Sequence, residues 1–398
     1  MTSRLGRLAP TRDLAVLSAV FFLIFAGTGS LQQYLVPYLE EHAGWSATWA
    51  PWSLATLYLS MIVWRLLAVY TIRRIGDYGS IALGALTYTL FPVAIIVSPT
   101  RPVVLVAAVL WGWGAASFWL ASGSQVLDTA REAHYGRASG IFYTATHLGM
   151  VCGLFTLGQC YRARPDSPAF LWIAFAAAAL GNALCLAVPR RRLPRDPPQL
   201  RAVLRVAFGR VGRVIAVPLV ASAVGYGLLL GIFAEIVGKR FGLGFMFAIT
   251  VSFYIMRAFI SLVSGALSDR IGTRRVLVLA FAASGIALVW PAFAQGAAPL
   301  VVAAGALGLL ASAVPVGITA LVGETASSGS RQAALAGLHV WRDMGVAVGL
   351  IGAAQLRAAF GGFREPFLAF AVIFVVCGLI AARLPEVGSA RAREPAER

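Results

Sequence analysis

Long apolar runs follow one another along most of this 398-residue chain, separated by short breaks that contain proline, glycine, arginine or acidic residues. A hydrocarbon layer about 30 Å thick is crossed by roughly 20 apolar residues in a helix, and only helices and closed barrels satisfy their backbone polar groups in lipid. Barrel strands alternate apolar and polar residues, and these runs do not. The chain is therefore predicted to be an all-α, polytopic membrane protein. We expect twelve spans, at 14–38, 49–72, 78–98, 102–127, 138–160, 168–188, 214–237, 243–268, 276–295, 299–323, 332–356 and 366–383.

Composition agrees with lipid as the solvent. Charged residues make up only 12% of the chain, against about a quarter in soluble domains, and the mean hydropathy is +0.80. The four cysteines all fall inside predicted spans, so we expect neither a disulfide framework nor a metal site. Because the sequence contains no protease, hydrolase or phosphate-loop motif, we predict no enzymatic chemistry and no cofactor.

The basic residues are distributed very unevenly between the two sides of the predicted membrane. A net charge of +17 would suggest nucleic acid as the partner of a soluble protein. Here 23 basic residues fall on the side that carries both termini and only seven on the other. Cytoplasmic loops carry such an excess. We therefore expect no nucleic-acid partner, and we expect a multi-pass protein, monomeric, in a bacterial inner membrane with both termini cytoplasmic.

One long charged segment interrupts the apolar runs, and it divides the chain into two halves of six spans. This segment reads PRRRLPRDPPQLRAVLRVAFGRVGR, from Pro189 to Arg213. We predict an N-terminal six-helix bundle at 1–188, a cytoplasmic basic linker at 189–213, and a C-terminal bundle at 214–398. The second part of the linker is basic and amphipathic, which favours a segment lying on anionic lipid headgroups. A regulatory binding helix is the alternative.

The two halves align with each other at one ungapped offset of 196 residues. This offset places RRIGDYG, from Arg73, on DRIGTRR, from Asp269. It also matches Asp128 with Glu324, and it matches three pairs of glycines. These glycines are Gly112 and Gly308, Gly149 and Gly345, and Gly153 and Gly349. Small residues four apart let helices approach closely in membranes. We therefore predict two pseudo-symmetric six-helix bundles, with close packing at the fifth span of each half.

A loop motif at the end of the eighth span identifies a family. The segment SGALSDRIGTRR resembles the G-x-x-x-D-R-x-G-R-R signature of the major facilitator superfamily, a group of secondary transporters. The resemblance implies the major facilitator fold and a conformational latch at this loop. The residues that match the signature or extend its basic run are Gly265, Asp269, Arg270, Gly272, Arg274 and Arg275.

The first half departs from the family pattern. Its motif copy is TIRRIGDYG, in which Arg73 replaces the acid and Gly79 replaces the last basic residue, so a latch there is in doubt. The patterns of proton-driven drug antiporters are absent from the fourth and fifth spans. Short glycine-rich matches at 57–58, 112–119 and 136–142 also resemble the branch of ion-channel regulatory proteins named for uncoordinated movement, which implies a possible regulatory role.

Four charged residues fall deep inside predicted spans, where an ionisable group is costly and is a functional candidate by default. They are Arg65, Arg257, Arg342 and Asp343. Arg257 is the preferred candidate for contact with a ligand, and Arg65 is a second one. His147 is the half-related equivalent of Asp343, so His147, Arg342 and Asp343 are candidates for proton coupling. If Asp343 pairs with Arg342 or with His147, Arg257 is left uncompensated; alternatively, Asp343 neutralises one arginine as an interhelical lock.

The family resemblance also implies that the first and fourth spans of each half line the substrate cavity. In the N-terminal half these spans carry polar and aromatic side chains, whereas the tenth span is almost featureless. We therefore expect the N-terminal half to dominate recognition of a substrate. The residues concerned are Gln32, Gln33, Tyr34, Trp111, Phe118 and Gln125.

Three functions remain open on the sequence. The leading hypothesis is alternating-access transport of a small organic solute, with an anion preferred because three deep arginines face one deep acid. A proton is a candidate co-substrate, and lipid is the surrounding partner. The second hypothesis is proton-driven efflux of drugs or cations, and the third is a regulator or scaffold that keeps the fold without transporting.

Overall fold

The computed structural model describes residues 11–130, 135–165, 167–188, 190, 199–271, 273–325 and 330–383. The first half contains α2 (Arg12–Ile24), η1 (Phe25–Gly29), α3 (Ser30–His42), α4 (Trp52–Val97), α5 (Arg101–Thr129), α6 (Tyr135–Ala163), α7 (Ala169–Leu184) and η3 (Cys185–Ala187). The second half contains α9 (Arg210–Leu228), η4 (Leu229–Phe233), α10 (Ala234–Phe241), η5 (Leu243–Phe245), α11 (Met246–Ile271), α12 (Thr273–Phe293), α13 (Ala297–Thr325), α14 (Arg331–Phe360) and α15 (Arg364–Ala381). Between the halves lies α8 (Leu200–Phe208).

Every predicted span corresponds to a helix. Within the described residues, ten helices are long and apolar enough to cross a membrane, and α13 adds the shorter apolar stretch Ala297–Ser312. One of the ten, α4, has 46 residues and contains two predicted spans. Large apolar side chains such as Ile286 on α12 and Leu379 on α15 are mostly exposed on the outside of the bundle, as lipid-facing side chains are. The all-α, twelve-span prediction is confirmed.

The second and third spans are joined by a break inside α4. At Gly76 the backbone has φ 77° and ψ 167°, and a left-handed φ of this kind favours glycine because it has no Cβ. Gly76 is the glycine of the first-half loop motif. The motif therefore keeps its turn although it has lost its acid.

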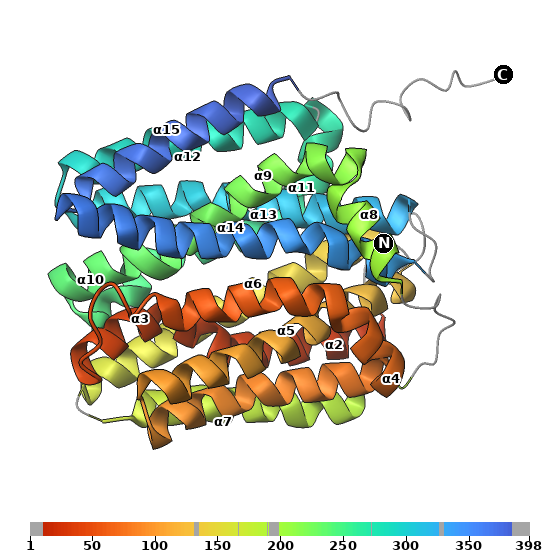
Figure 1. The fold of residues 1–398 in the computed structure, drawn as a ribbon, viewed down its shortest axis with the longest axis horizontal. Helices are drawn as coiled ribbons and strands as arrows, with labels where there is room; N and C mark the ends of the chain where they lie inside the picture. Colours follow the sequence, from red (N-terminus) through yellow and green to blue (C-terminus); the bar gives the residue numbers. More distant parts are fainter. Residues whose placement is uncertain are drawn as a thin grey trace, which may run out of the picture.

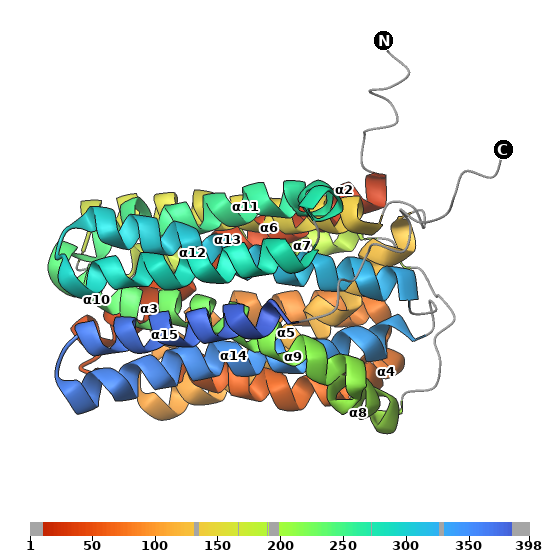
Figure 2. The same cartoon turned by 90° about the horizontal axis from the view of Figure 1, so that it is seen from above.

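The two halves lie side by side as two bundles with all long helices roughly parallel (Figure 1). The described chain begins and ends at one end of the molecule, which we call the terminal end; α10 lies at the opposite, distal end (Figures 1 and 2). The helix α8 lies at the terminal end on the outer edge of the bundle (Figure 2). An even number of crossings places both chain termini on the same side of a membrane.

The internal repeat is visible in the packing of the fourth span on the second. A Cβ added at Gly112 would lie 2.8 Å from the carbonyl oxygen of Leu57, and one added at Gly308 would lie 2.3 Å from that of Phe253. Both the glycines and the carbonyls are 196 residues apart. The two halves therefore use the same close approach at the same register, as the sequence offset predicts.

The predicted glycine contacts of the fifth spans are also present. In α6, Gly149 and Gly153 pack directly on the backbone of the first span, where an added Cβ would lie 2.2 Å and 2.1 Å from the carbonyl oxygens of Phe22 and Ala26. In α14, Gly345 and Gly349 pack in the same way on α9, against the carbonyl oxygens of Val220 and Val224. These carbonyls are 198 residues apart, so the first spans are displaced by two residues relative to the rest of the repeat.

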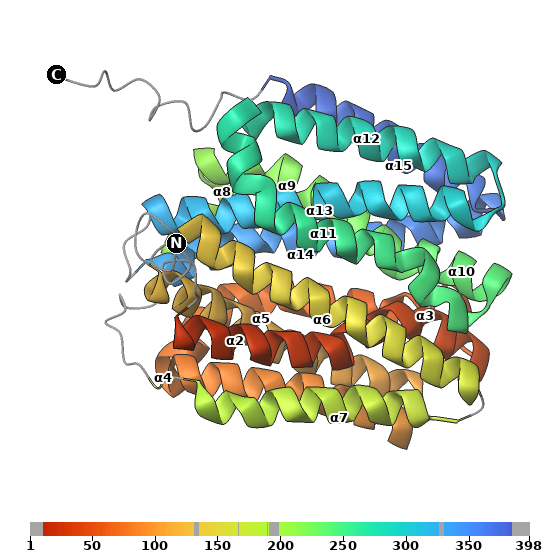
Figure 3. The same ribbon diagram turned by 180° about the vertical axis from the view of Figure 1, so that it is seen from behind.

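Two pairs of helices form most of the interface between the halves. In one pair α4 packs on α14, and in the other α6 packs on α11 (Figure 3). Each pair joins a second or eighth span to the fifth span of the opposite half, so the interface also follows the repeat. A central site bounded by these pairs receives side chains from both halves.

Candidate functional site

A small polar cavity lies between the halves at mid-depth. It leaves only about 30 Å³ open to the centre of a water molecule. Twelve of its sixteen lining residues belong to the N-terminal half, in agreement with the expectation that this half supplies most of the lining. The polar and aromatic lining comprises Phe25, Gln32, Tyr58, Tyr88, Trp111, Trp119, Thr146, His147, Tyr226, Tyr254, Arg257 and Arg342.

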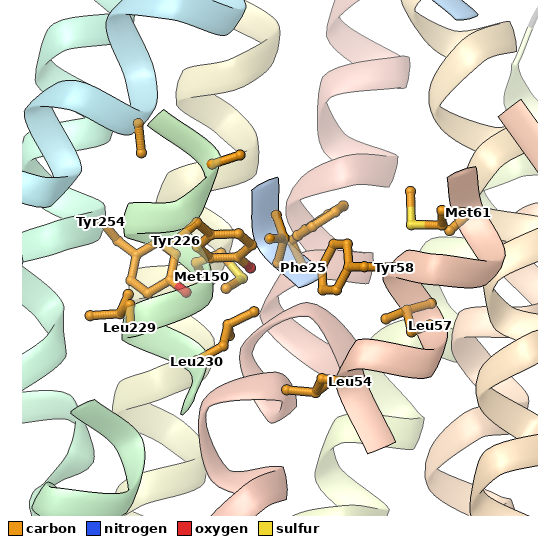
Figure 4. Packing of buried hydrophobic residues seen from close by; sticks show 14 of the residues in the cluster. Phe25, Leu54, Leu57, Tyr58, Met61, Met150, Tyr226, Leu229, Leu230 and Tyr254 are labelled. Carbon is orange, nitrogen blue, oxygen red and sulfur yellow. The ribbon is translucent and has the colours of Figure 1, made fainter. Parts of the chain in front are cut away.

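Two half-related tyrosines hold neighbouring glutamines at the edge of this cavity. The Tyr58 hydroxyl donates a hydrogen bond to Oε1 of Gln32 (2.8 Å), and Nε2 of Gln33 donates to the hydroxyl of Tyr254 (2.8 Å). Tyr58 and Tyr254 are 196 residues apart. Tyr226 lies between them, with its ring centroid 6.4 Å from that of Tyr58 (Figure 4). The two halves therefore meet here through aromatic rings and amide groups.

Arg257 reaches the cavity from α11 and has an aromatic environment. Its guanidinium lies 5.3 Å from the ring centroids of both Tyr226 and Phe253, and the residue is 7% exposed. Its Nε has no hydrogen-bond partner among the described residues, and no described carboxylate forms an ion pair with it. Aromatic faces stabilise a guanidinium in part. They leave its positive charge uncompensated.

Arg342 brings a second guanidinium to the cavity from α14. Its guanidinium lies 5.4 Å from the ring centroid of Trp119, whose indole N–H donates to the hydroxyl of Tyr88 (3.1 Å). His147 lines the same cavity, with its ring 6.3 Å from that of Tyr143, and both arginines act on it electrostatically. The described lining thus contains two cations and a histidine, and no carboxylate.

Asp343 is bound by Arg65 across the two halves. The Arg65 Nε donates to Asp343 Oδ2 at 2.9 Å, and both side chains are essentially inaccessible, at 1% and 0%. Arg65 also donates to the carbonyl oxygen of Ala116 (3.3 Å). Of the two alternatives that the sequence left open, Asp343 therefore forms its ion pair with Arg65 and not with Arg342 or His147. The alternative, an interhelical lock, describes what the structure shows, and it leaves Arg257 uncompensated.

Three residues expected at the cavity do not line it. The Tyr34 hydroxyl donates to the carbonyl oxygen of Leu154 (2.7 Å), on the side of the first span that faces α6. Phe118 stacks on Phe21 with ring centroids 4.3 Å apart and belongs to the apolar core. Gln125 lies on α5 beyond the cavity. Gln32 and Trp111 do line it, and Gln33 reaches its edge through Tyr254.

Ionic contacts close the terminal end. Arg331, at the start of α14, donates to Asp128 Oδ1 (2.9 Å) and to the hydroxyl of Tyr135 (2.5 Å), and its guanidinium lies 4.9 Å from the Tyr135 ring centroid. Next to it, Nε2 of Gln332 donates to Asp77 Oδ1 (2.7 Å). None of these side chains was among the predicted site residues, because polar residues near the ends of membrane-spanning helices are common. One of these contacts had a signal in the sequence, because Asp77 directly follows the glycine of the first-half loop motif.

The predicted latch cannot be placed. Of Gly265, Asp269 and Arg270 the structure describes only the helical backbone, and Gly272 lies outside the described residues. Arg274 and Arg275 lie at the start of α12, where Arg275 is exposed. The latch stays a prediction.

The distal end is closed by a second ionic cluster. The Lys239 Nζ lies 2.5 Å from Glu235 Oε1 within the C-terminal half and 3.4 Å from Glu40 Oε2 of the N-terminal half. Arg357 also contacts Glu235. Glu235 is buried, and its two cationic neighbours offset the cost of burying its charge. Polar contacts therefore join the two halves at both ends of the molecule.

A membrane protein with two six-helix halves that enclose a polar cavity has the architecture of a secondary transporter. The chain belongs to the Major Facilitator Superfamily, whose sequence model matches residues 17–246 and 215–398. Together these ranges cover nearly the whole chain, and the family predicted from the loop motif is confirmed.

Solved transporter structures share the fold. The human organic anion transporter MFSD10 (TETRAN) is 15% identical, with a TM-score of 0.73, and the alignment covers 94% of this chain and 100% of that one. The nucleoside transporter NupG is 13% identical, with a TM-score of 0.72 and coverage of 93% and 98%. The transporter FucP in its outward conformation is 14% identical, with a TM-score of 0.66 and coverage of 93% and 98%. Similarity at this level is one of fold. No curated protein matches the sequence.

Proposed function

We propose that this protein is a secondary transporter that moves a small organic anion across the membrane by alternating access. The observation that carries the proposal is a central cavity that is lined by two guanidiniums, those of Arg257 and Arg342, and by no described carboxylate; Asp343 acts electrostatically on Arg342 but is itself bound by Arg65. A charged side chain at the centre of a bilayer costs about 2.5–3.5 kcal/mol even by the lowest estimates. A bound anion offsets this cost, and a bound cation increases it.

The residue types that line the cavity favour an anion with an apolar or aromatic part. Both cations come from the C-terminal half, whereas most of the aromatic lining comes from the N-terminal half. A carboxylate that is bound by Arg257 would therefore hold the remainder of the molecule against Tyr58, Tyr88 and Trp111. The solved neighbour described as an organic anion transporter agrees with this substrate class.

Proton coupling belongs to the same proposal. Asp343 is the one acid at mid-depth among the described spans, and it is held by Arg65 of the other half. Protonation of Asp343 would remove the charge that holds Arg65 and would free the two halves to separate at mid-depth. His147, between two cations, is the second candidate for this step.

Efflux of cations is disfavoured by the lining of the central cavity, because no acid lines the described cavity. A regulator without transport activity would not need a polar cavity between its halves.

For the orientation, we propose cytoplasmic termini in a bacterial inner membrane, on the basis of the excess of arginine at the terminal end.

The test uses purified full-length protein and a ligand series of matched shape: benzoate, benzamide and benzylamine, followed by larger aromatic carboxylates. We expect the carboxylates to raise the thermal unfolding temperature and the amine to have no effect, because only an anion compensates the arginines. Arg257→Lys should weaken carboxylate binding at least tenfold, since lysine cannot form two parallel hydrogen bonds. Arg164→Gln, at an exposed distal site, is the matched control.

Two results would overturn the proposal. One is stabilisation by benzylamine and not by any carboxylate. The other is carboxylate binding that is unchanged in Arg257→Lys and in Arg257→Gln. Uptake of the bound carboxylate into liposomes then separates a transporter from a binding protein that does not transport.

A further inference from the structure

The linker helix α8 has an outer surface whose chemistry the transport cavity does not use. We propose that this surface binds the headgroup and upper acyl chains of an anionic phospholipid. The proposal concerns a surface remote from the central cavity and does not depend on the identity of the transported solute.

The inner face of α8 is firmly packed on the C-terminal half. Val203 and Ala207 are completely buried, and a Cβ added at Gly337 of α14 would lie 2.7 Å from the carbonyl oxygen of Val203. The Trp341 indole N–H donates to the carbonyl oxygen of Ala207 (2.8 Å). Because one face of the helix is fixed in this way, the side chains on its other faces have defined directions.

The start of α8 also touches the N-terminal half. The backbone N–H of Leu200 donates to the hydroxyl of Tyr70 on α4 (3.1 Å). Ten residues before Leu200, the guanidinium of Arg190 lies 4.7 Å from the ring centroid of Tyr78, which follows the break in α4. The linker therefore contacts both halves at the terminal end.

Two different stripes run along the outside of α8. Leu200, Leu204 and Phe208 are four residues apart and lie on one side of the helix; Leu200 is 37% exposed and Phe208 is 51% exposed. Beside them, Arg201 and Arg205 are both exposed and lie one helical turn apart. Neither arginine has an ion-pair partner among the described residues.

This arrangement fits a lipid better than a soluble ligand or a nucleic acid. Arginines one turn apart can both bind a single phosphate, and guanidiniums match phosphate geometry. An adjacent apolar stripe would be left in water by a soluble phosphate or a nucleic acid, whereas a phospholipid covers it with acyl chain. The helix lies at the terminal end on the outside of the bundle, where headgroups are found (Figure 2). Arg73 and Arg74, one turn beyond Tyr70 on α4, are also exposed and add positive charge there.

The test is a lipid titration of the purified full-length protein, followed by native mass spectrometry. The probes are phosphatidylglycerol and phosphatidylcholine with identical acyl chains. We expect the wild type to retain phosphatidylglycerol preferentially. The double variant Arg201→Gln/Arg205→Gln should lose roughly thirtyfold in phosphatidylglycerol affinity, since each of the two basic residues near an anionic surface contributes about 1 kcal/mol.

Two further variants make the result specific. Arg201→Lys/Arg205→Lys keeps the charge and should retain most of the binding. Arg101→Gln/Arg164→Gln removes two exposed arginines from the distal end and should leave binding unchanged. Equal retention of both lipids by the wild type, or equal loss in the distal control, would overturn the proposal. Displacement of the lipid by millimolar glycerol phosphate would also overturn it, because it would show a site for a soluble phosphate.

Discussion

Arg65 and Asp343 show how one contact can join two halves that are otherwise packed through apolar and small residues. Their side chains come from positions 278 residues apart, and both are removed from solvent. Removing one partner of a buried ion pair leaves an uncompensated charge, whereas replacing both with apolar groups of similar size is often neutral. The pair can therefore serve as a releasable lock without being a large source of stability.

This difference gives a prediction at the residue scale. Asp343→Leu alone should destabilise the protein by about 3 kcal/mol, because Arg65 remains buried and unpaired. The double variant Arg65→Met/Asp343→Leu should recover most of that loss. Thermal unfolding of the purified variants measures both effects, and Arg164→Gln, at an exposed distal site, serves as the control. Additive losses in the double variant would show that the two side chains act independently.

The sequence predicted which deep residues matter better than it predicted their partners. Arg65, Arg257, Arg342 and Asp343 stand out because charge is rare in lipid-spanning helices, and all four lie at the centre of the molecule. The partner of Asp343 depends on how two distant helices are docked, which local sequence does not encode. Tyr34 was assigned to the cavity wrongly for a related reason. In its helix, residues 30–37 are buried on all sides and polar residues do not follow a helical period, so the pattern does not tell which face points inward.

At the scale of helices, the glycine contacts are the repeated feature of the structure. Gly153 of α6 and Gly349 of α14 each occupy a position where an added Cβ would lie within 2.5 Å of a first-span carbonyl oxygen. The clash is with backbone, so a neighbouring side chain cannot relieve it. Both glycines are thus required for the first and fifth spans to pack.

We predict that Gly153→Val and Gly349→Val will each destabilise the protein by 2 kcal/mol or more, about the cost of overpacking a core. Gly123→Ala, whose Cβ would meet only Leu335 Cδ1 at an ordinary 3.5 Å, should be nearly neutral. Thermal unfolding followed by gel filtration distinguishes these outcomes. Unfolding temperatures for both valine variants within a degree of the control would contradict the proposed packing role.

The elements could be predicted from the sequence almost completely, with one exception in each half. Apolar length gave all twelve spans, and the glycine repeat gave their close contacts. The wide π-helical turns in the first span of each half, Phe25–Gly29 and Leu229–Phe233, were not predicted. A π-turn adds one residue to a helical turn without changing its composition, so an apolar run shows no sign of it.

At the scale of the whole molecule, the two halves are joined at both ends by polar contacts of similar kind. Arg331 joins the halves at the terminal end through Asp128 and Tyr135, and Lys239 joins them at the distal end through Glu40. Alternating access requires that the two ends open one at a time. The two clusters should therefore have opposite effects on the conformational equilibrium.

These two clusters give a prediction about the populations of the conformations that are open at the terminal end and at the distal end. Arg331→Gln should favour opening of the terminal end, and Lys239→Gln should favour opening of the distal end. In a cysteine-free background, spin labels at Arg74 and Arg213 report the terminal end, and labels at Ser46 and Gln295 report the distal end; all four sites are exposed. Longer distances should appear only at the end that carries the substitution. Arg101→Gln should change neither distance, and longer distances at both ends in either gate variant would indicate partial unfolding.

The contact between Arg331 and Tyr135 has a consequence for the history of the chain. These residues are 196 positions apart, so they are the same position in the two halves, and they touch each other where the halves meet. In an ancestral dimer of identical six-helix subunits, this position would have faced a copy of itself. Two arginines there would repel, and two tyrosines would lack a cation. An arginine bound to a tyrosine became possible only after gene duplication and fusion let the two copies mutate separately. The Arg331–Tyr135 contact therefore depends on a difference in sequence between the two halves, and a symmetric dimer of identical halves could not have made it.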